Sequence, residues 1–359
     1  MSRTARIVVL PGDGIGPEVI DAALLVLEAT AARFGLSLAF ERRLIGAAAL
    51  HQGLAPLPDE TLDACRAADA VLLGAVGHPD FDRAPRNEKP ETALLRLRKE
   101  LGLYANLRPA RMWPGLEEAG PLKPERVSGT DLLIVRELAG GLYYGEPRGF
   151  DADGTAAFNT LRYTTGEIER VARVAFDAAQ GRRGKLTLVD KANVLETSQL
   201  WSTTVERMAG SFPSVRLDHL YVDACAMLLA QEPRRFDVIL TENMFGDILS
   251  DEAGSVCGSI GLLPSASLGD GPGLYEPVHG SAPTLAGTDV ANPIGAIGSA
   301  ALLLRHSLRH EQAAAAIEDA IAATLAAGRR TPDIATGSAP ALSCSAVGRH
   351  VADRVRQTA

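Results

Sequence analysis

The sequence predicts an α/β fold, and three observations carry that prediction. Short β-rich runs alternate with longer segments whose apolar residues recur at helical spacing. At 359 residues the chain exceeds one ordinary core, which indicates two domains or one large α/β unit. Its 46% hydrophobic and 22% charged residues are typical of globular proteins and exclude a disordered chain.

The individual elements follow from local signals along the chain. Each predicted strand is a short β-rich run, and the first helix opens on Pro17, since proline is favoured at a first helical position. Glycine and proline in 140–164 predict hairpins that project from the body, and 262–293 is expected to be loop-rich. Strands are expected at 6–10, 37–40, 70–73, 131–136, 185–189, 216–221 and 236–240. Helices are expected at 17–34, 59–67, 91–101, 165–180, 195–208, 224–230, 245–257, 294–308, 311–327 and 344–357.

Charge and hydropathy exclude several classes of function. A formal net charge of −8 without a basic run argues against nucleic acid or an anionic membrane surface as the main partner. No apolar stretch approaches the roughly 20 residues that span a bilayer, and the N-terminal segment resembles no secretory signal. The four cysteines are scattered, which favours core thiols over a disulfide or zinc set. A cytoplasmic protein is expected.

The acidic motif at 241–251 indicates a metal site. Asp247 and Asp251 are four residues apart, so on a helix both carboxylates share one face and repel each other unless a cation lies between them. Mg²⁺ or Mn²⁺ takes such carboxylates together with substrate oxygens. Asp223 is a third acid at the end of a predicted strand, where α/β sheets place ligands. Two solvated acids in a first helical turn remain an alternative for the pair.

Basic and hydroxyl side chains form a second set of candidates. Arg98, Arg108 and Arg136 could together hold a substrate with two carboxylates, although each alone could be a solvated arginine. The chain has 5 lysines against 31 arginines, a ratio that composition bias explains. Lys191 nevertheless follows a predicted strand, where a lysine with a lowered pKa can act as a base. Tyr143 lies in a glycine-rich turn and could donate a proton. For both residues, packing with a satisfied polar tip is the alternative.

The glycine turn at 12–16 is not a dinucleotide-binding fingerprint. Its glycines are spaced G-x-G-x-G and are followed by proline, whereas the fingerprint is G-x-G-x-x-G. A Rossmann fold is therefore disfavoured.

Taken in order, these motifs resemble the isocitrate/isopropylmalate dehydrogenase family of β-decarboxylating dehydrogenases. The similarity extends from residue 10 to about residue 328. It rests on LPGDGIGPE (10–18), ETALLRLR (91–98), ANLRP (105–109), VRELAGGLYYGEP (135–147), VDKANVL (189–195), YVD (221–223), NMFGDILSD (243–251), LPSASL (263–268), EPVHGSAP (276–283) and ANP (291–293).

The resemblance implies a non-Rossmann fold of two discontinuous α/β domains, with parallel or mixed sheets flanked by helices. Residues 1–103 and 258–359 would form the first, cofactor-side domain, and 104–257 would form the second. It also implies a homodimer through the second domain, with active sites shared across the interface. An arm around 149–162 would be exchanged between the two subunits.

The resemblance further implies an activity. Within the family the chain is most similar to members that oxidise and decarboxylate (2R,3S)-3-isopropylmalate to 4-methyl-2-oxopentanoate and CO₂, with reduction of NAD, in leucine biosynthesis. By resemblance, the three arginines hold the substrate carboxylates. Asp247, Asp251 and Asp223 of the partner subunit bind Mg²⁺ or Mn²⁺, and Asp223 also contacts substrate. Lys191 of the partner subunit acts as the base, and Tyr143 protonates the enol.

Two further groups of residues are expected to set specificity. Glu91, Leu94, Leu95 and Val194 would meet the substituent of the substrate, and the two leucines favour an isopropyl group over a third carboxylate. Burial of three carbons at about 0.8 kcal/mol each gives roughly 2.4 kcal/mol, or about 50-fold over malate. NAD is expected along Ile15, Glu276, His279, Gly280, Ser281, Ala282, Thr284 and Asn292.

Thr284 departs from the family pattern, because NAD-dependent members usually carry aspartate there to hold the adenosine ribose. Loss of that charge-assisted hydrogen bond costs roughly 1.5–3 kcal/mol. We therefore expect NAD to be used, with weaker discrimination against NADP than is usual.

Two other functions remain open at this stage. One is a paralogous enzyme for another 3-substituted malate or for tartrate. The other is a non-catalytic regulatory subunit of the same fold, which the presence of Tyr143, Lys191, Asp223, Asp247 and Asp251 opposes.

Overall fold

A single ten-stranded sheet runs through the computed structural model, which describes residues 3–337 and 340–357. Its order is β2-β1-β3-β12-β11-β4-β5-β10-β8-β9. Neighbouring strands are parallel except β12–β11, β11–β4 and β4–β5, which are antiparallel. The strands are β1 (Ala5–Gly12), β2 (Leu38–Arg42), β3 (Ala70–Ala75), β4 (Leu103–Arg111), β5 (Asp131–Glu137), β8 (Lys185–Asp190), β9 (Arg216–Tyr221), β10 (Val238–Thr241), β11 (Pro264–Gly269) and β12 (Gly273–Pro277).

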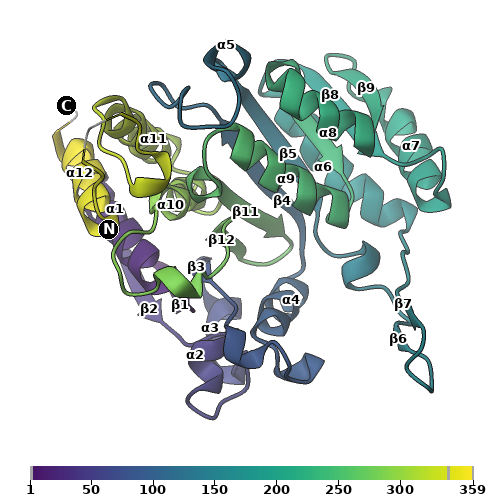
Figure 1. Cartoon of the computed structure of the whole chain (residues 1–359), viewed down its shortest axis with the longest axis horizontal. Helices are drawn as coiled ribbons and strands as arrows, with labels where there is room; N and C mark the ends of the chain where they lie inside the picture. Colours follow the sequence, from purple (N-terminus) through teal and green to yellow (C-terminus); the bar gives the residue numbers. More distant parts are fainter. Residues whose placement is uncertain (1–2, 338–339, 358–359) are drawn as a thin grey trace.

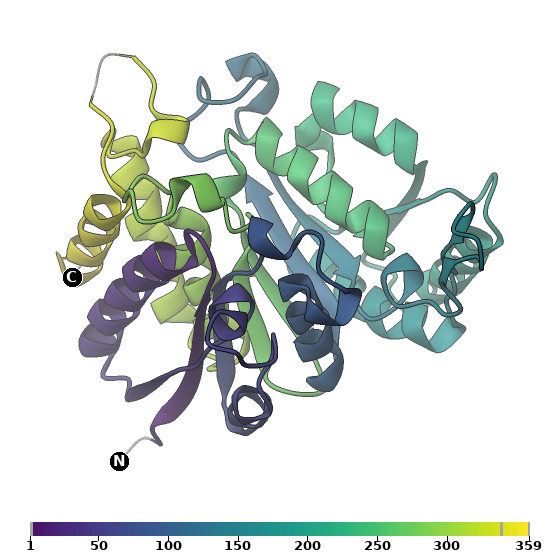
Figure 2. The same cartoon turned by 60° about the horizontal axis from the view of Figure 1, so that its bottom comes forward.

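Helices cover both faces of this sheet, which confirms the predicted α/β class (Figures 1 and 2). Several boundaries have local causes: Pro17 lies in the first turn of α1, and a capping box between Thr164 and Glu167 starts α6. The helices are α1 (Gly16–Phe34), α2 (Ala47–Leu50), α3 (Asp59–Ala67), α4 (Pro90–Glu100), α5 (Pro124–Val127), α6 (Thr165–Gln180), α7 (Glu196–Ala209), α8 (Val222–Gln231), α9 (Asn243–Val256), α10 (Ile294–His306), α11 (Glu311–Ala326) and α12 (Cys344–Gln357). Among the described residues, no helix is both long and apolar enough to cross a membrane.

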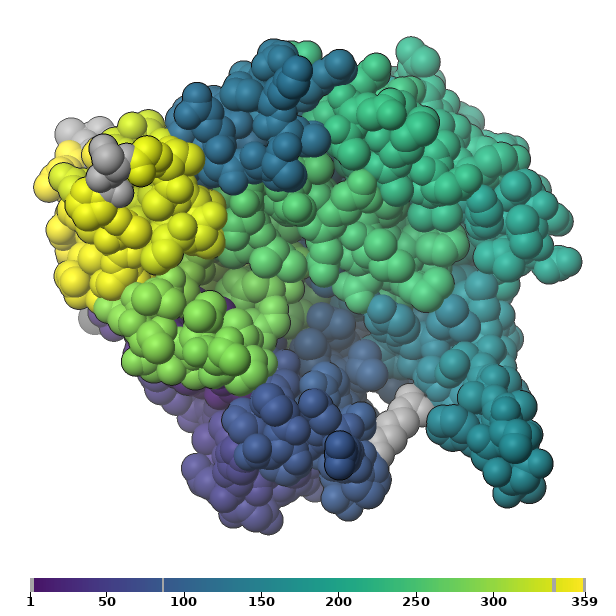
Figure 3. Space-filling model, viewed as in Figure 1, coloured from purple at the N-terminus to yellow at the C-terminus, as the bar shows by residue number. Residues whose placement is uncertain are grey.

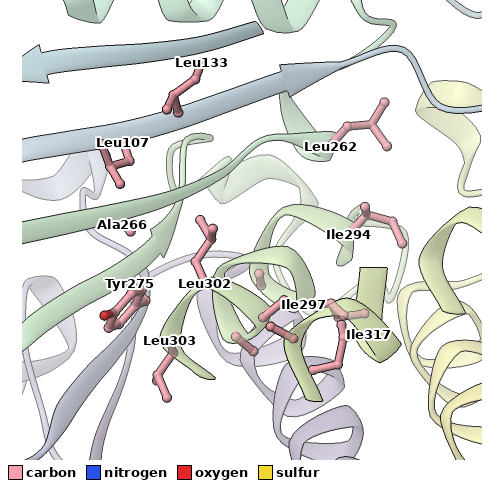
Figure 4. Packing of buried hydrophobic residues seen from close by; sticks show 14 of the residues in the cluster. Leu107, Leu133, Leu262, Ala266, Tyr275, Ile294, Ile297, Leu302, Leu303 and Ile317 are labelled. Atoms are coloured by element: carbon pink, nitrogen blue, oxygen red, sulfur yellow. The ribbon is translucent and has the colours of Figure 1, made fainter. Parts of the chain in front are cut away.

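One face of the sheet carries a continuous apolar core. Leu107 and Leu133 of the central strands and Tyr275 of β12 face Ile297 and Leu302 of α10 (Figure 4). Helix α1 packs against both α10 and α12, so the first and last helices lie side by side. This core spans both halves of the sheet and fixes their relative position on this face.

The opposite face has two separate cores with polar side chains between them. Helices α3 and α4 cover the strands on the β1 and β3 side, whereas α8 and α9 cover β5, β8 and β10. Because side chains alternate along a strand, residues next to core positions point into the space between these helix groups. The candidate site occupies that space.

Three strands were not predicted from the sequence. The segment 262–293 was expected to be loop-rich, but it contains β11 and β12, and no strand was expected at 103–111, where β4 lies. The prediction was wrong because β11 (PSASLG) lacks β-branched residues and β4 carries Arg108 and Pro109. Strand β11 pairs only with residues 103–107 of β4, so Pro109 has a neighbouring strand, β5, on one side only. Proline is tolerated there because it lacks the N–H group that pairing on both sides would need.

Part of the segment 140–164 projects from the body as predicted, whereas its ends lie within the body, where Gly141 and Tyr163 are buried. Strands β6 (Gly149–Phe150) and β7 (Ala157–Phe158) form a two-stranded hairpin that stands away from the sheet (Figures 1 and 3). The two predicted domains would meet in the centre of the sheet, where β11 pairs with β4. The division into two domains and the exchange of the hairpin stay predictions.

Candidate active site

Three buried arginines lie together on the polar side of the sheet. Arg98 comes from α4, Arg108 from β4 and Arg136 from β5, and all three are less than 10% exposed. Arg108 and Arg136 alternate with the core residues Leu107 and Val135, so the pleat turns both guanidinium groups to the same face. The three side chains line a cavity of about 210 Å³.

Acceptors fixed by the fold hold two of these guanidinium groups in place. Arg136 donates from Nε and Nη2 to Asn243 Oδ1, at 3.0 and 2.8 Å, and from Nη1 to Asp247. Arg108 donates to Asn106 Oδ1 at 2.7 Å and to Ser250 Oγ at 2.6 Å. Burial beside the other arginines lowers the pKa of Arg136 to about 10, which still leaves it charged at neutral pH.

Arg98 is paired with a carboxylate from another strand. Its Nη2 lies 2.6 Å from Glu276 Oε1, and both side chains are only 8% exposed. Burial opposes the charged form of Arg98, but Glu276 outweighs burial and raises its pKa. Nε of Arg98 is buried without a partner. Glu276 was predicted as a cofactor residue; here it lines the cavity with the three arginines.

Tyr143 lies at the edge of the same cavity. Its hydroxyl donates to Asp247 Oδ2 over 2.8 Å. Burial, followed by this hydrogen bond to a carboxylate, raises the pKa of Tyr143 to about 12. The phenol is therefore protonated at neutral pH, and its proton is donated to Asp247 at the edge of the cavity.

The acidic motif lies on α9, where Asp247 and Asp251 share one face as predicted. Arg108 Nη1 lies 3.2 Å from Asp247 Oδ1 and 3.7 Å from Asp251 Oδ1. Burial raises the pKa of Asp247, but Arg136, Arg108 and the Tyr143 hydroxyl outweigh burial, and the pKa is lowered. Burial dominates at Asp251, and its pKa is raised. The pair offers hard oxygen ligands, which fit Mg²⁺ or Mn²⁺.

Lys191 and Asp223 form a separate pair. Lys191 Nζ lies 2.7 Å from Asp223 Oδ1, and that hydrogen bond lowers the pKa of Asp223. The lysine follows β8 and the aspartate follows β9, at the same edge of the sheet as Arg136 and Asn243. Within the described chain neither residue shares a hydrogen bond or ion pair with Asp247, and the side chains are 26% and 68% exposed.

The predicted substituent pocket is only partly assembled within one chain. Leu94 lines the cavity beside Arg98. Leu95 is half-buried, and its carbonyl oxygen accepts a hydrogen bond of 3.3 Å from Tyr144. Glu91 is exposed beside Gly77, and Val194 is 61% exposed away from the cavity-lining residues.

Most of the predicted cofactor residues lie in the chain that follows β12, which packs against the glycine turn that carries Ile15. Ile15 donates its backbone N–H to the Ser281 carbonyl oxygen at 2.8 Å, and a side chain at Gly14 would clash with that same carbonyl. His279 is buried, which lowers its pKa, and its Nε2 has no partner. His279 and Gly280 line the cavity. The other members of this segment are Ala282, whose φ is +36°, Thr284 in a short 3₁₀ turn, and Asn292, which donates to Asp333 at 3.0 Å.

Sequence reasoning missed residues that position this site. Asn106, Asn243 and Ser250 hold the arginines but belong to no charge pattern. Asp13 was treated only as part of the glycine turn. Its carboxylate accepts backbone N–H bonds from Ala47, Ala48 and Gly77 and anchors the start of α2. The available sequence signal was an aspartate between two glycines.

Comparison with known proteins shows the family of the chain. The family model "Isocitrate/isopropylmalate dehydrogenase" matches residues 6–351. The chain belongs to this family. It is 56% identical over 355 residues to the 3-isopropylmalate dehydrogenase of Gloeobacter violaceus, covering 98% of each protein. It is 58% identical to that of Moorella thermoacetica over 331 residues, covering 92% of this chain and 93% of the relative.

Solved structures place this member of the isocitrate/isopropylmalate dehydrogenase family in the same fold. The crystal structure of isocitrate dehydrogenase from Methylococcus capsulatus superposes with a TM-score of 0.88 at 38% identity, covering 98% of this chain and 100% of the other. The non-Rossmann fold that the motifs implied is thereby confirmed.

Proposed function

We propose that the chain catalyses the oxidative decarboxylation of 3-isopropylmalate to 4-methyl-2-oxopentanoate and CO₂ with reduction of NAD, a step of leucine biosynthesis. One observation carries the proposal: three buried arginines converge on a cavity that also holds Tyr143, Asp247 and an apolar wall at Leu94. The names and identities of the relatives described above support it.

The arginines account for binding of a dicarboxylate. Asn243 and Asn106 are neutral acceptors that orient Arg136 and Arg108 without cancelling their charge, and the one carboxylate of Asp247 is shared between the two guanidinium groups. The unpartnered Nε of Arg98 adds a donor that a carboxylate oxygen would satisfy. Bidentate contacts from planar arginines would fix the orientation of the C2–C3 bond.

The proposed reaction has three steps. The C2 hydroxyl loses its proton as hydride leaves C2, then the bond from C3 to its carboxylate breaks and CO₂ departs, and the resulting enolate takes a proton at C3. Tyr143, held protonated, is the donor for the last step. Lys191 of the partner subunit is the base for the first.

The cofactors follow from the donors present. When bound, NAD accepts the hydride and a divalent ion polarises the C2 oxygen. Asp247 and Asp251 would hold the ion together with Asp223 of the partner subunit. The loop from His279 to Thr284 would hold NAD, where the unpartnered Nε2 of buried His279 offers a polar contact.

A homodimer with shared sites explains surfaces that one chain leaves open. Ile248, on the helix that carries the acidic motif, is 60% exposed, and Met227 of the neighbouring helix α8 is 52% exposed. Phe150 on the hairpin is 76% exposed. Since Lys191 and Asp223 lie outside the cavity of their own chain, we propose that they complete the partner's cavity. The four free, buried cysteines suit the cytoplasm that we propose as its location.

The decisive experiment is a substrate panel. Malate, tartrate, isocitrate, homoisocitrate and 3-isopropylmalate are each assayed with NAD and with NADP in the presence of Mg²⁺ or Mn²⁺. The proposal requires the highest kcat/KM for 3-isopropylmalate with NAD. Preference for isocitrate would contradict the apolar wall at Leu94, and preference for tartrate or another 3-substituted malate would favour the paralogous function.

A further inference from the structure

A second cluster of metal-ligating side chains lies outside the cavity. His51 follows α2, and His78 and Asp80 lie in the loop after β3. One ligand atom from each residue lies within 4.8 Å of the others. The carboxylate oxygen Asp80 Oδ2 is 3.3 Å from both His51 Nε2 and His78 Nδ1.

We propose that these three residues bind a borderline transition-metal ion such as Zn²⁺, with water completing the coordination. Zinc binds histidine nitrogen at about 2.0–2.1 Å and carboxylate oxygen at about 2.0–2.2 Å, so neighbouring ligand atoms of a tetrahedron lie about 3.3 Å apart. Both nitrogen–oxygen separations have this value. They are longer than the roughly 2.7–2.9 Å of a charge-assisted hydrogen bond.

The backbone beneath the cluster is already fixed. Asp13 accepts hydrogen bonds from Ala47 N at 2.9 Å and from Gly77 N at 2.8 Å, so one buried carboxylate ties together the two segments that carry the ligands. The His51 and His78 rings meet edge to face with centroids 5.2 Å apart. Binding would therefore require only rotation of side chains.

The ligand atoms are also free for an ion. His51 and Asp80 are about half exposed or more, and His78 is 30% exposed. Within the described residues, their polar side-chain contacts are with one another and with the Asp80 backbone N–H at 3.3 Å from His78 Nδ1. The bond from Asp80 N–H makes His78 Nδ1 the cap of the short 3₁₀ turn at Pro79–Phe81, so an ion bound by this nitrogen would replace that one long hydrogen bond.

The chemistry separates this cluster from the aspartate pair on α9. Imidazole nitrogen suits zinc, nickel, cobalt and copper, whereas carboxylate sets suit Mg²⁺ and Mn²⁺. An ion here would join the end of α2 to the loop that leads into α4, the helix of Leu94 and Arg98. It would restrain the rim of the cavity without touching the reacting atoms.

The test is a titration of the full-length protein with Co²⁺ and Zn²⁺ in excess Mg²⁺, which occupies the aspartate pair. Visible absorption of Co²⁺ and calorimetry with Zn²⁺ should both give one equivalent. His51→Ala and His78→Ala should each weaken binding roughly 10-fold or more. His350→Ala, on α12, is the matched histidine control and should bind like the wild type, as should Asp251→Asn.

Hydrogen exchange and the variant Asp80→Asn provide a second, independent test of the site. Zn²⁺ should slow hydrogen exchange of backbone amides in 46–55 and 77–82, and it should not do so in Asp80→Asn, which preserves the shape of the side chain. Asp80→Asn also serves if a histidine variant fails to fold. Equal binding by the wild type and the His51, His78 and Asp80 variants would overturn the proposal. Loss of binding in Asp251→Asn or in His350→Ala would also overturn it.

Discussion

Tyr143→Phe tests the proposed proton donor by removing one oxygen atom. The substitution deletes the 2.8 Å hydrogen bond to Asp247. A hydrogen bond to a charged partner is worth about 1.5–3 kcal/mol, which corresponds to roughly 10- to 150-fold in rate if the bond only positions Asp247. Loss of a general acid costs about 10²- to 10⁴-fold. We expect kcat to fall within the upper part of that range with little change in KM.

Tyr144→Phe is the matched control, because it removes the same atom from the next residue. The Tyr144 hydroxyl donates to the Leu95 carbonyl oxygen over 3.3 Å and makes no contact with Asp247. NADH formation from 3-isopropylmalate measures both variants, and circular dichroism verifies that both are folded. The reasoning is refuted if Tyr143→Phe retains kcat close to that of the wild type, or if the two variants lose the same amount.

The remaining predictions concern specificity, metal and pH. Leu95→Arg should abolish turnover of 3-isopropylmalate, and unchanged kcat/KM would contradict the pocket proposed for Leu94 and Leu95. Thr284→Asp should lower the KM for NAD by roughly 10- to 150-fold, the equivalent of one charge-assisted hydrogen bond, without helping NADP. Removal of divalent ions with EDTA should stop NADH formation, and Mg²⁺ should restore it; activity that persists without ions would count against the aspartate pair. Burial raises the pKa of Glu137 from 4.5 to about 7. The folded state therefore binds this proton more tightly, and the free energy of unfolding should fall by about 3 kcal/mol as pH rises from 4.5 to 7. Glu137→Gln should flatten that decline in denaturant titrations, and an unaltered slope would contradict the shift.

Much of the outer fold could be predicted, because periodicity and caps act locally. Helix α6 begins at Thr165 and ends at Gln180, as predicted, and the structure adds a capping box at its start. The centre of the sheet could not be predicted in this way. Strands β11 and β12 pair with each other locally, but their other neighbours, β4 and β3, are distant in sequence, so small or polar residues such as Ser265, Ser267 and Asn106 are tolerated there.

The site shows the same division between local and distant effects. The spacing of Asp247 and Asp251 predicted that both carboxylates share one helix face, and in α9 both lie near Arg108. The pairing of Arg98 with Glu276 was not visible, because 178 residues separate the partners and no local rule joins them. Lys191 was singled out because lysine is rare in this chain. Its proposed place in the cavity of the partner subunit depends on how two chains associate, which one sequence does not describe.

The β11–β4 ladder has a consequence for how the protein reaches its native state. Residues 103–107 pair with 266–269, so the middle of the sheet closes only after more than 150 intervening residues have been synthesised. Contacts of such long range form slowly, and domains emerging from the ribosome fold as units before distant partners arrive. A nascent chain can therefore assemble the strands from β4 to β10 while the Arg98 guanidinium still lacks Glu276. The binding cavity is therefore completed only when the strands that precede β4 and those that follow β10 join the central sheet.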